Sequence, residues 1–113
     1  MHDHQEEHRN EISVQELAEI LRGVCPPRLI DVRGADEQAI AHIEGFLPAT
    51  QELMQEMIAT WAKDTPIVTV CHHGIRSLAA ASDLIERGFT NVRSLQGGID
   101  AWALQIDPSM SRY

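Results

Sequence analysis

The chain has 113 residues, of which 43% are hydrophobic and 23% are charged. These values are typical of one globular domain with a buried core, and they exclude fibrous and largely disordered classes. The formal net charge of −8 argues against a nucleic-acid-binding surface, because such a surface needs clustered lysine and arginine side chains.

The N-terminal residues 1–11 are polar and contain no apolar stretch that would predict a signal peptide or a membrane span. We therefore expect a cytoplasmic protein that does not bind membranes. His2, His4 and His8 lie in this segment, which we interpret as a flexible acidic arm rather than a metal-binding tract. The predicted domain spans residues 12–107, and residues 108–113 are expected to form a C-terminal tail.

A first helix is predicted directly after the arm. Ser13 and Glu16 have the spacing of a capping box. Apolar residues then recur every three or four positions, which indicates one buried helix face. This stripe consists of Leu17, Ile20, Leu21 and Val24. Gly23 and the run Cys25-Pro26-Pro27 are expected to end the helix.

The rest of the domain is predicted to alternate short strands with helices. The expected strands cover residues 28–33, 46–48, 67–70 and 91–95, and the expected helices cover residues 36–41, 51–62, 77–87 and 98–106. Asp36 and Thr50 would cap two of these helices at their N-termini, and Gly88 would end a third. This alternation indicates a parallel sheet with helices on both faces, in which ligands bind beyond the C-terminal ends of the strands.

The segment from Val70 to Ser77 is the main candidate site. Cys71 directly follows the apolar strand 67–70, so we expect its thiol at the C-terminal edge of the sheet. Loop N–H groups, the positive end of the next helix and the Arg76 guanidinium would each stabilise a thiolate. The pattern predicts a reactive nucleophile, although a cysteine that only packs could occupy the same position.

The second cysteine, Cys25, lies just before a Pro-Pro pair. A structural disulfide would consume the one thiol with an activating environment, so we expect both thiols to be reduced. No spacing of cysteine and histidine residues matches a zinc site.

Over about residues 12–106 the chain resembles the rhodanese-like sulfurtransferases. Five segments match in the family's order: Leu29–Arg33 with Glu37 at the expected offset, Ala41–Gly45, Val70–Ser77, Gly88–Val92 and Leu95–Trp102. Two departures concern the outer strand: Gln38 stands where the family often has an aromatic residue, and residues 46–49 replace its Ala-x-x-Ile-Pro stretch. The resemblance implies an α/β fold of three layers, with a central, mainly parallel sheet of about five strands and helices on both faces.

The same resemblance implies a thiosulfate sulfurtransferase. The Cys71 thiolate would take the outer sulfur of thiosulfate, release sulfite, and pass the sulfur from a persulfide to cyanide or a thiol. The active-site loop would consist of His72, His73, Gly74, Ile75, Arg76 and Ser77. Its N–H groups would hold the transferred sulfur, and Arg76 would bind the donor's sulfonate. Gly74 would provide a backbone position that no side chain allows, so that the loop can curl around the sulfur. We expect neither a cofactor nor a metal ion.

Several roles near the loop stay open from the sequence. His72 and His73 either contact the substrate or are bystanders. Asp31 and Arg33 are interpreted as supporting residues that form a structural charge pair rather than as catalysts. The expected partners are a small-molecule sulfur donor and acceptor, with a protein acceptor as a further candidate, and the chain is expected to be a monomer or a weak homodimer.

Three other functions were compared with sulfur transfer. Phosphatases and arsenate reductases of the same fold resemble the chain but have five residues between cysteine and arginine, whereas only four lie between Cys71 and Arg76. The shorter loop favours a single sulfur atom over a tetrahedral oxyanion. Non-catalytic regulatory modules of the family typically lack the cysteine. A sulfur carrier that serves a protein partner cannot be separated from a thiosulfate enzyme by sequence.

Overall fold

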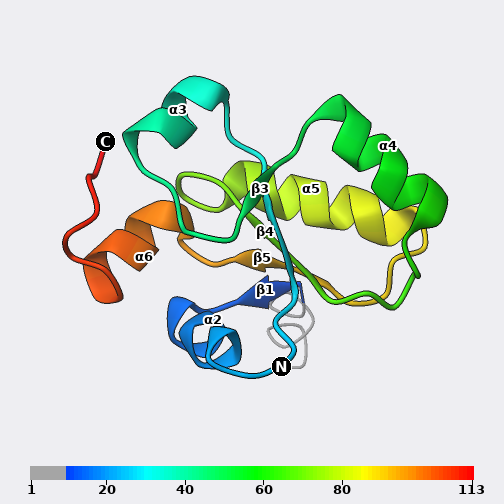
Figure 1. Ribbon diagram of the computed structural model, residues 1–113, viewed down its shortest axis with the longest axis horizontal. Helices are drawn as coiled ribbons and strands as arrows, with labels where there is room; N and C mark the ends of the chain where they lie inside the picture. The colour runs from blue at the N-terminus through cyan, green and yellow to red at the C-terminus, as the bar shows by residue number, and fades with distance from the viewer. Residues whose placement is uncertain (1–9) are drawn as a thin grey trace, which may run out of the picture.

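The computed structural model describes residues 10–113, which form alternating strands and helices (Figure 1). The strands are β1 (Glu11–Ile12), β2 (Arg28–Asp31), β3 (Leu47–Pro48), β4 (Ile67–Val70) and β5 (Val92–Leu95). The helices are α2 (Val14–Leu21), α3 (Ala35–Ile40), α4 (Gln51–Thr60), α5 (Ile75–Glu86) and α6 (Gly98–Gln105).

The five strands form one sheet in the order β1-β5-β4-β2-β3, and every neighbouring pair is parallel. All four residues of the central strand β4 are buried, as expected for a strand covered on both faces. The predicted mainly parallel sheet is confirmed. The end of β4 therefore lies in the middle of the sheet's C-terminal edge, where α/β proteins bind ligands.

Two apolar cores lie on opposite faces of the sheet. Adjacent strand residues such as Leu29 and Ile30 belong to different cores, because side chains alternate between the faces of a strand. Helices α2 and α6 cover one face and α4 and α5 cover the other (Figure 1). Met57 of α4 is completely buried, so it belongs to the core.

The predicted helix starts are correct at two positions and shifted at two others. Ser13 accepts a hydrogen bond from the Glu16 N–H at 3.0 Å, and Thr50 caps α4 in the same way. Helix α3 begins earlier than expected, because Gly34 and not Asp36 is its N-cap. Helix α5 likewise begins at Ile75 rather than at residue 77, so the helix starts inside the cysteine loop.

The expected position of Val24 on the buried stripe of the first helix is wrong. Helix α2 ends at Leu21, and the Val24 side chain is 97% exposed. The two prolines and Gly23 stop the helix before its periodicity can place Val24 on the core.

The sheet extends into the segment predicted to be a flexible arm. Glu11 and Ile12 form β1, which pairs with Ser94 and Leu95 of β5. Two residues are too few for a recognisable strand pattern, so the sequence does not predict this edge strand. His2, His4 and His8 lie outside the described residues. In the described part of the chain, no helix is long and apolar enough to cross a bilayer.

The segment 108–113, predicted to be a tail, packs on the domain. Met110 contacts the core beneath α2 and α6. Arg112 donates to Asp100 of α6 at 2.9 Å, and Tyr113 stacks on His72 with ring centroids 3.9 Å apart. These contacts bring the segment to the cysteine loop.

Candidate active site

Cys71 lies directly after β4, and its side chain is buried. Cys25 is exposed. Cys71 therefore occupies the expected position at the centre of the C-terminal edge of the sheet. Neither cysteine forms a disulfide, as expected.

Three groups of the loop form hydrogen bonds with the Cys71 sulfur. The N–H groups of Gly74 and Ser77 donate to Sγ at 3.1 and 3.3 Å, and the Ser77 hydroxyl lies 3.4 Å from Sγ. Burial acts to raise the pKa of the Cys71 thiol, but these hydrogen bonds lower it and prevail, so the pKa lies below its ordinary value. The site therefore favours a thiolate.

Gly74 lets the loop turn back over the sulfur. Its φ of +104° is in the left-handed region, which a side chain disfavours. In this conformation its N–H points at Sγ, and helix α5 begins at the next residue. The predicted backbone role of Gly74 is confirmed.

The first turn of α6 supports the cysteine loop through backbone hydrogen bonds. The N–H groups of Ile99 and Asp100 donate to the carbonyls of Cys71 and His72 at 2.9 and 3.1 Å. A Cβ atom on Gly98 would lie 2.4 Å from both carbonyl oxygens. Gly98 is therefore needed for this close approach, a requirement that its motif did not reveal.

Arg76 points to helix α3 and pairs with Glu37. Both terminal nitrogens of its guanidinium donate to the Glu37 carboxylate, at 2.8 and 2.9 Å. The hydrogen bonds from Arg76 lower the pKa of Glu37 to about 2, although burial opposes the shift. The hydrogen bonds with Glu37 raise the pKa of Arg76, and negative charge on Cys71 adds to this shift. The guanidinium and a Cys71 thiolate therefore attract each other.

Asp31 and Arg33 form the predicted charge pair, and both are buried. The Arg33 side chain donates to Asp31 at 2.8 Å and to the carbonyls of Ala41 and Glu37 at 2.7 and 3.2 Å. The Arg33 guanidinium also donates to the Tyr113 hydroxyl at 2.8 Å. Arg33 thus joins β2, α3 and the C-terminal segment, which is a structural role.

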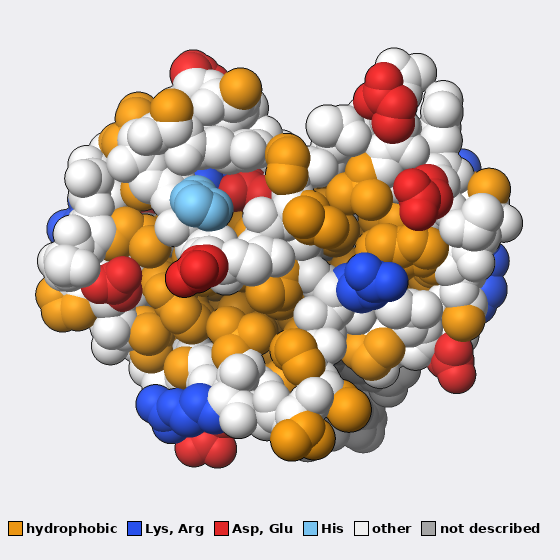
Figure 2. Space-filling view, in the orientation of Figure 1, with side chains coloured by type: hydrophobic (Ala, Val, Ile, Leu, Met, Phe, Trp, Pro, Cys, Tyr) orange, Lys and Arg blue, Asp and Glu red, His pale blue; other side chains and the backbone are white. Residues whose placement is uncertain are grey.

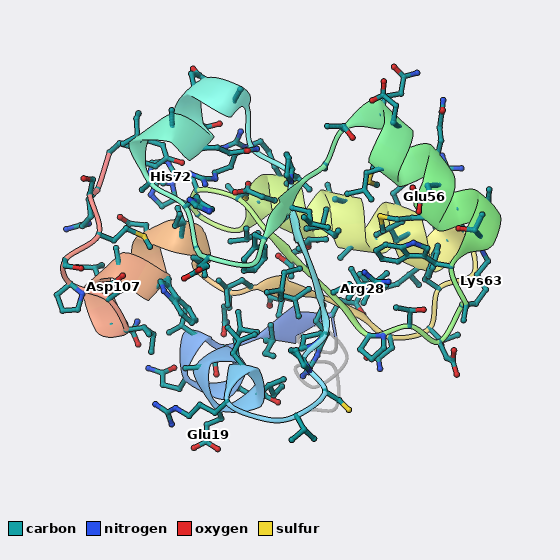
Figure 3. The ribbon with its side chains drawn as sticks, in the orientation of Figure 1. Glu19, Arg28, Glu56, Lys63, His72 and Asp107 are labelled. Atoms are coloured by element: carbon teal, nitrogen blue, oxygen red, sulfur yellow. The ribbon has the colours of Figure 1, made fainter. Side chains whose placement is uncertain are left out.

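The two histidines of the loop differ in their surroundings. His72 is stacked between His73 and Tyr113, with ring centroids 3.9 Å apart on each side. Figure 3 shows His72 between α3 and α6. His72 Nε2 is buried without a hydrogen-bond partner among the described residues. The His73 ring is mostly exposed and lies 3.9 Å from the Asp100 carboxylate.

His72, His73 and Asp100 are close enough to be considered as metal ligands. Their ligand atoms all lie within 4.8 Å of one another. The two rings, however, are stacked at 23°, so their in-plane lone pairs do not converge on one point. Asp100 is also paired with Arg112, whose hydrogen bond lowers the pKa of the Asp100 carboxyl. The grouping is a stack with an ion pair rather than a preformed metal centre.

Three residues of the site escaped prediction. Ser94 of β5 lies 2.6 Å from the Ser77 hydroxyl, but β5 also contains Arg93, so a second polar residue in this strand carries no distinct signal. From the sequence, Gly98 is expected only to lead into the last helix. Tyr113 carries no sequence signal, because its place beside His72 depends on how the C-terminal segment packs.

Comparisons with known proteins agree with this geometry. The profile of the rhodanese-like domain matches residues 13–105. The chain is 35% identical over 91 residues to the thiosulfate sulfurtransferase GlpE of Shewanella oneidensis, which covers 80% of this chain and 89% of that protein.

A second relative is the probable adenylyltransferase/sulfurtransferase MoeZ of Mycobacterium tuberculosis. It is 36% identical over 104 residues, which cover 90% of this chain and 26% of that protein. Among solved structures, the human single-domain sulfurtransferase TSTD1 has a TM-score of 0.73 at 23% identity, over 85% of this chain and 96% of that chain. This last likeness concerns the fold.

Proposed function

Because the chain belongs to the rhodanese-like family, we propose that it is a thiosulfate sulfurtransferase that carries the transferred sulfur on Cys71. The observation that supports this role most directly concerns the buried Sγ atom at the end of β4. It accepts hydrogen bonds from the N–H groups of Gly74 and Ser77. A thiolate held by backbone donors is a nucleophile in a site that also suits a second, negatively charged sulfur.

In the first step, the Cys71 thiolate attacks the outer sulfur of thiosulfate. A new S–S bond forms, the bond between that sulfur and the sulfonate sulfur breaks, and sulfite leaves with the bonding electron pair. In the second step, cyanide attacks the terminal sulfur of the persulfide. Thiocyanate forms and the Cys71 thiolate is regenerated, so no oxidant or reductant is consumed.

Arg76 is proposed to bind the sulfonate of the donor. Its pairing with Glu37 uses one edge of the guanidinium, and a guanidinium has further N–H groups that can donate to an oxyanion. Glu37 would hold the Arg76 side chain in place while those groups contact the donor.

A protein acceptor is a second candidate for the final step. Ile75 is 80% exposed next to the catalytic loop, and it lines a groove together with His73, Leu78 and Ala79. An exposed apolar side chain at the rim of a site fits a protein surface better than a small anion. Sulfur transfer of this kind needs reduced thiols, so we propose the cytoplasm as its compartment.

The test of this proposal is the intact mass of the protein after incubation with thiosulfate. We expect a gain of one sulfur atom, which subsequent cyanide removes. Cys71→Ser should show no gain. Cys25→Ser should behave like the unmodified chain, because Cys25 is exposed and lies before the start of β2, whereas Cys71 follows the end of β4. A chain that gains no sulfur and turns over a phosphate ester or arsenate would contradict the proposal.

A further inference from the structure

A chain of three buried groups runs from β5 to the reactive sulfur. Ser94 on β5 and Ser77 in the first turn of α5 are both fully buried. Their hydroxyl oxygens are 2.6 Å apart, and the Ser77 hydroxyl is 3.4 Å from Cys71 Sγ. Ser94 thus contacts the hydroxyl that is hydrogen-bonded to the sulfur, without touching the sulfur itself.

Among the described residues, the two serine hydroxyl groups form no hydrogen bonds besides those that link Ser94, Ser77 and Cys71 Sγ. In the described part of the protein, the Ser94 hydroxyl has no hydrogen-bond partner other than Ser77. The neighbouring Thr69, which is opposite Ser94 in the sheet, donates its hydroxyl to the Ser77 carbonyl at 2.8 Å. Thr69 therefore fixes the Ser77 backbone and is not part of the hydroxyl chain.

The number of protons shows which protonation state of Cys71 these three hydrogen-bonded groups favour. The three groups are joined by two hydrogen bonds. With a thiolate, the two hydroxyl protons fill both bonds: Ser94 donates to Ser77, and Ser77 donates to Sγ. With a thiol, Sγ donates to Ser77 and Ser77 donates to Ser94. The third proton, on Ser94, then has no acceptor among the three groups, and a buried donor without an acceptor is unfavourable.

We propose that Ser94 is a positioning residue that keeps the Ser77 hydroxyl directed as a donor to the Cys71 thiolate. Ser94 is not a base: the proton that leaves the thiol goes to solvent, and both serines keep their own. The proposal rests on the proposed function only in that Cys71 acts as a thiolate. It extends the site to β5, a strand that contains none of the predicted site residues.

The test measures the alkylation rate of Cys71 by iodoacetamide as a function of pH. It uses a Cys25→Ser background, because Cys25 is exposed and would react as well. In Ser94→Ala we expect the inflection of the profile to move to higher pH. Below the inflection, the rate should fall about three- to ten-fold, the range that corresponds to one neutral hydrogen bond.

A double-mutant cycle tests whether Ser94 acts through Ser77. Ser77→Ala should raise the inflection more than Ser94→Ala does, and adding Ser94→Ala to it should cause no further change. If Ser94→Ala shifted the inflection equally in both backgrounds, the proposal that Ser94 acts through Ser77 would be wrong. Ser94→Thr keeps a hydroxyl, so it should retain the unmodified profile if it folds.

Thr69→Val is the matched control for a purely structural effect. It removes a buried hydroxyl that donates to the Ser77 carbonyl and takes no part in the hydrogen bonds that link Ser94, Ser77 and Cys71 Sγ. We expect a lower melting temperature and an unchanged inflection. If Ser94→Ala lowers the melting temperature like Thr69→Val and leaves the inflection in place, Ser94 has only a packing role. Alkylation needs no sulfur donor, so this outcome is independent of whether the chain uses thiosulfate.

Discussion

At the scale of single residues, two opposing effects set the charge on Cys71. Burial disfavours the thiolate, while the donors from Gly74 and Ser77 favour it and prevail. The two arginines near the site differ in how deeply their ion pairs are buried. Arg33 is buried with Asp31, whereas the Arg76 side chain is half exposed. A buried pair is costly to break, and an exposed one contributes little to stability.

This difference leads to a prediction for Arg76→Ala. We expect the KM for thiosulfate to rise about ten-fold or more, because a charge-assisted contact to the sulfonate is lost. The free energy of unfolding should change by less than about 1 kcal/mol, because the pair with Glu37 is exposed on the arginine side. Steady-state kinetics and urea unfolding measure the two effects.

Arg87→Ala is the matched control for this prediction. Arg87 lies at the other end of α5, is paired with Asp83, and has a side chain that is 50% exposed, as is that of Arg76. It should change neither quantity appreciably. An unchanged KM in Arg76→Ala would remove Arg76 from the substrate site.

At the scale of elements, the cysteine loop is held between two neighbours. Helix α3 contacts it through the pair of Glu37 with Arg76. The first turn of α6 contacts it through backbone hydrogen bonds to the carbonyls of Cys71 and His72. Because both carbonyls are fixed, the N–H groups on the other side of the loop keep their direction toward the sulfur.

This support predicts a large effect of Gly98→Ala. The new Cβ would lie 2.4 Å from two backbone oxygens and would also strain a positive φ. We expect a loss of more than about 3 kcal/mol in unfolding free energy, or a displaced loop with slower Cys71 alkylation.

Gly88→Ala separates the two causes. Gly88 has a positive φ as well, but a Cβ there would lie 3.9 Å from the Lys63 side chain, without a clash. We expect a cost of about 1 to 2 kcal/mol from the backbone alone, with alkylation unchanged. Equal losses in the two variants would show that the contact between Gly98 and the cysteine loop is unimportant.

At the scale of the whole molecule, the acidic net charge opposes the approach of an anionic donor. The formal charge is −8, and the described part measures 40 × 37 × 28 Å. Figure 2 shows basic side chains scattered over the viewed face rather than gathered in one patch. The net negative charge therefore repels an anion, no basic patch on the viewed face offsets this repulsion, and Arg76 of the cysteine loop is paired with Glu37.

This charge distribution predicts that salt assists thiosulfate turnover. Between 10 and 150 mM ionic strength the screening length falls from about 30 to about 8 Å, so kcat/KM for thiosulfate should rise roughly three-fold or more. Alkylation by uncharged iodoacetamide, measured above the Cys71 inflection, is the control and should barely change. A fall of kcat/KM with salt would mean that local attraction by Arg76 exceeds the repulsion.

Much of the fold follows from local patterns that the sequence shows directly. Apolar runs predict β2, β4 and β5, and the Ser13 and Thr50 caps predict the starts of α2 and α4, because these elements are determined by neighbouring residues. The same holds for the place of Cys71 at the end of β4 and for the left-handed turn at Gly74. Edge strand β1 is too short for such a pattern, and the periodicity of α2 wrongly includes Val24.

Contacts between distant segments could be decided only by the tertiary structure. The sequence determined that a reactive cysteine precedes a helix and is followed by Arg76. Only packing decided that Arg76 pairs with Glu37, that Tyr113 stacks on His72, and that Ser94 reaches Ser77 from another strand. The physical reason is that hydrogen bonds and stacking depend on distances of a few ångströms between residues 17 to 41 positions apart in the chain. No local pattern records such distances.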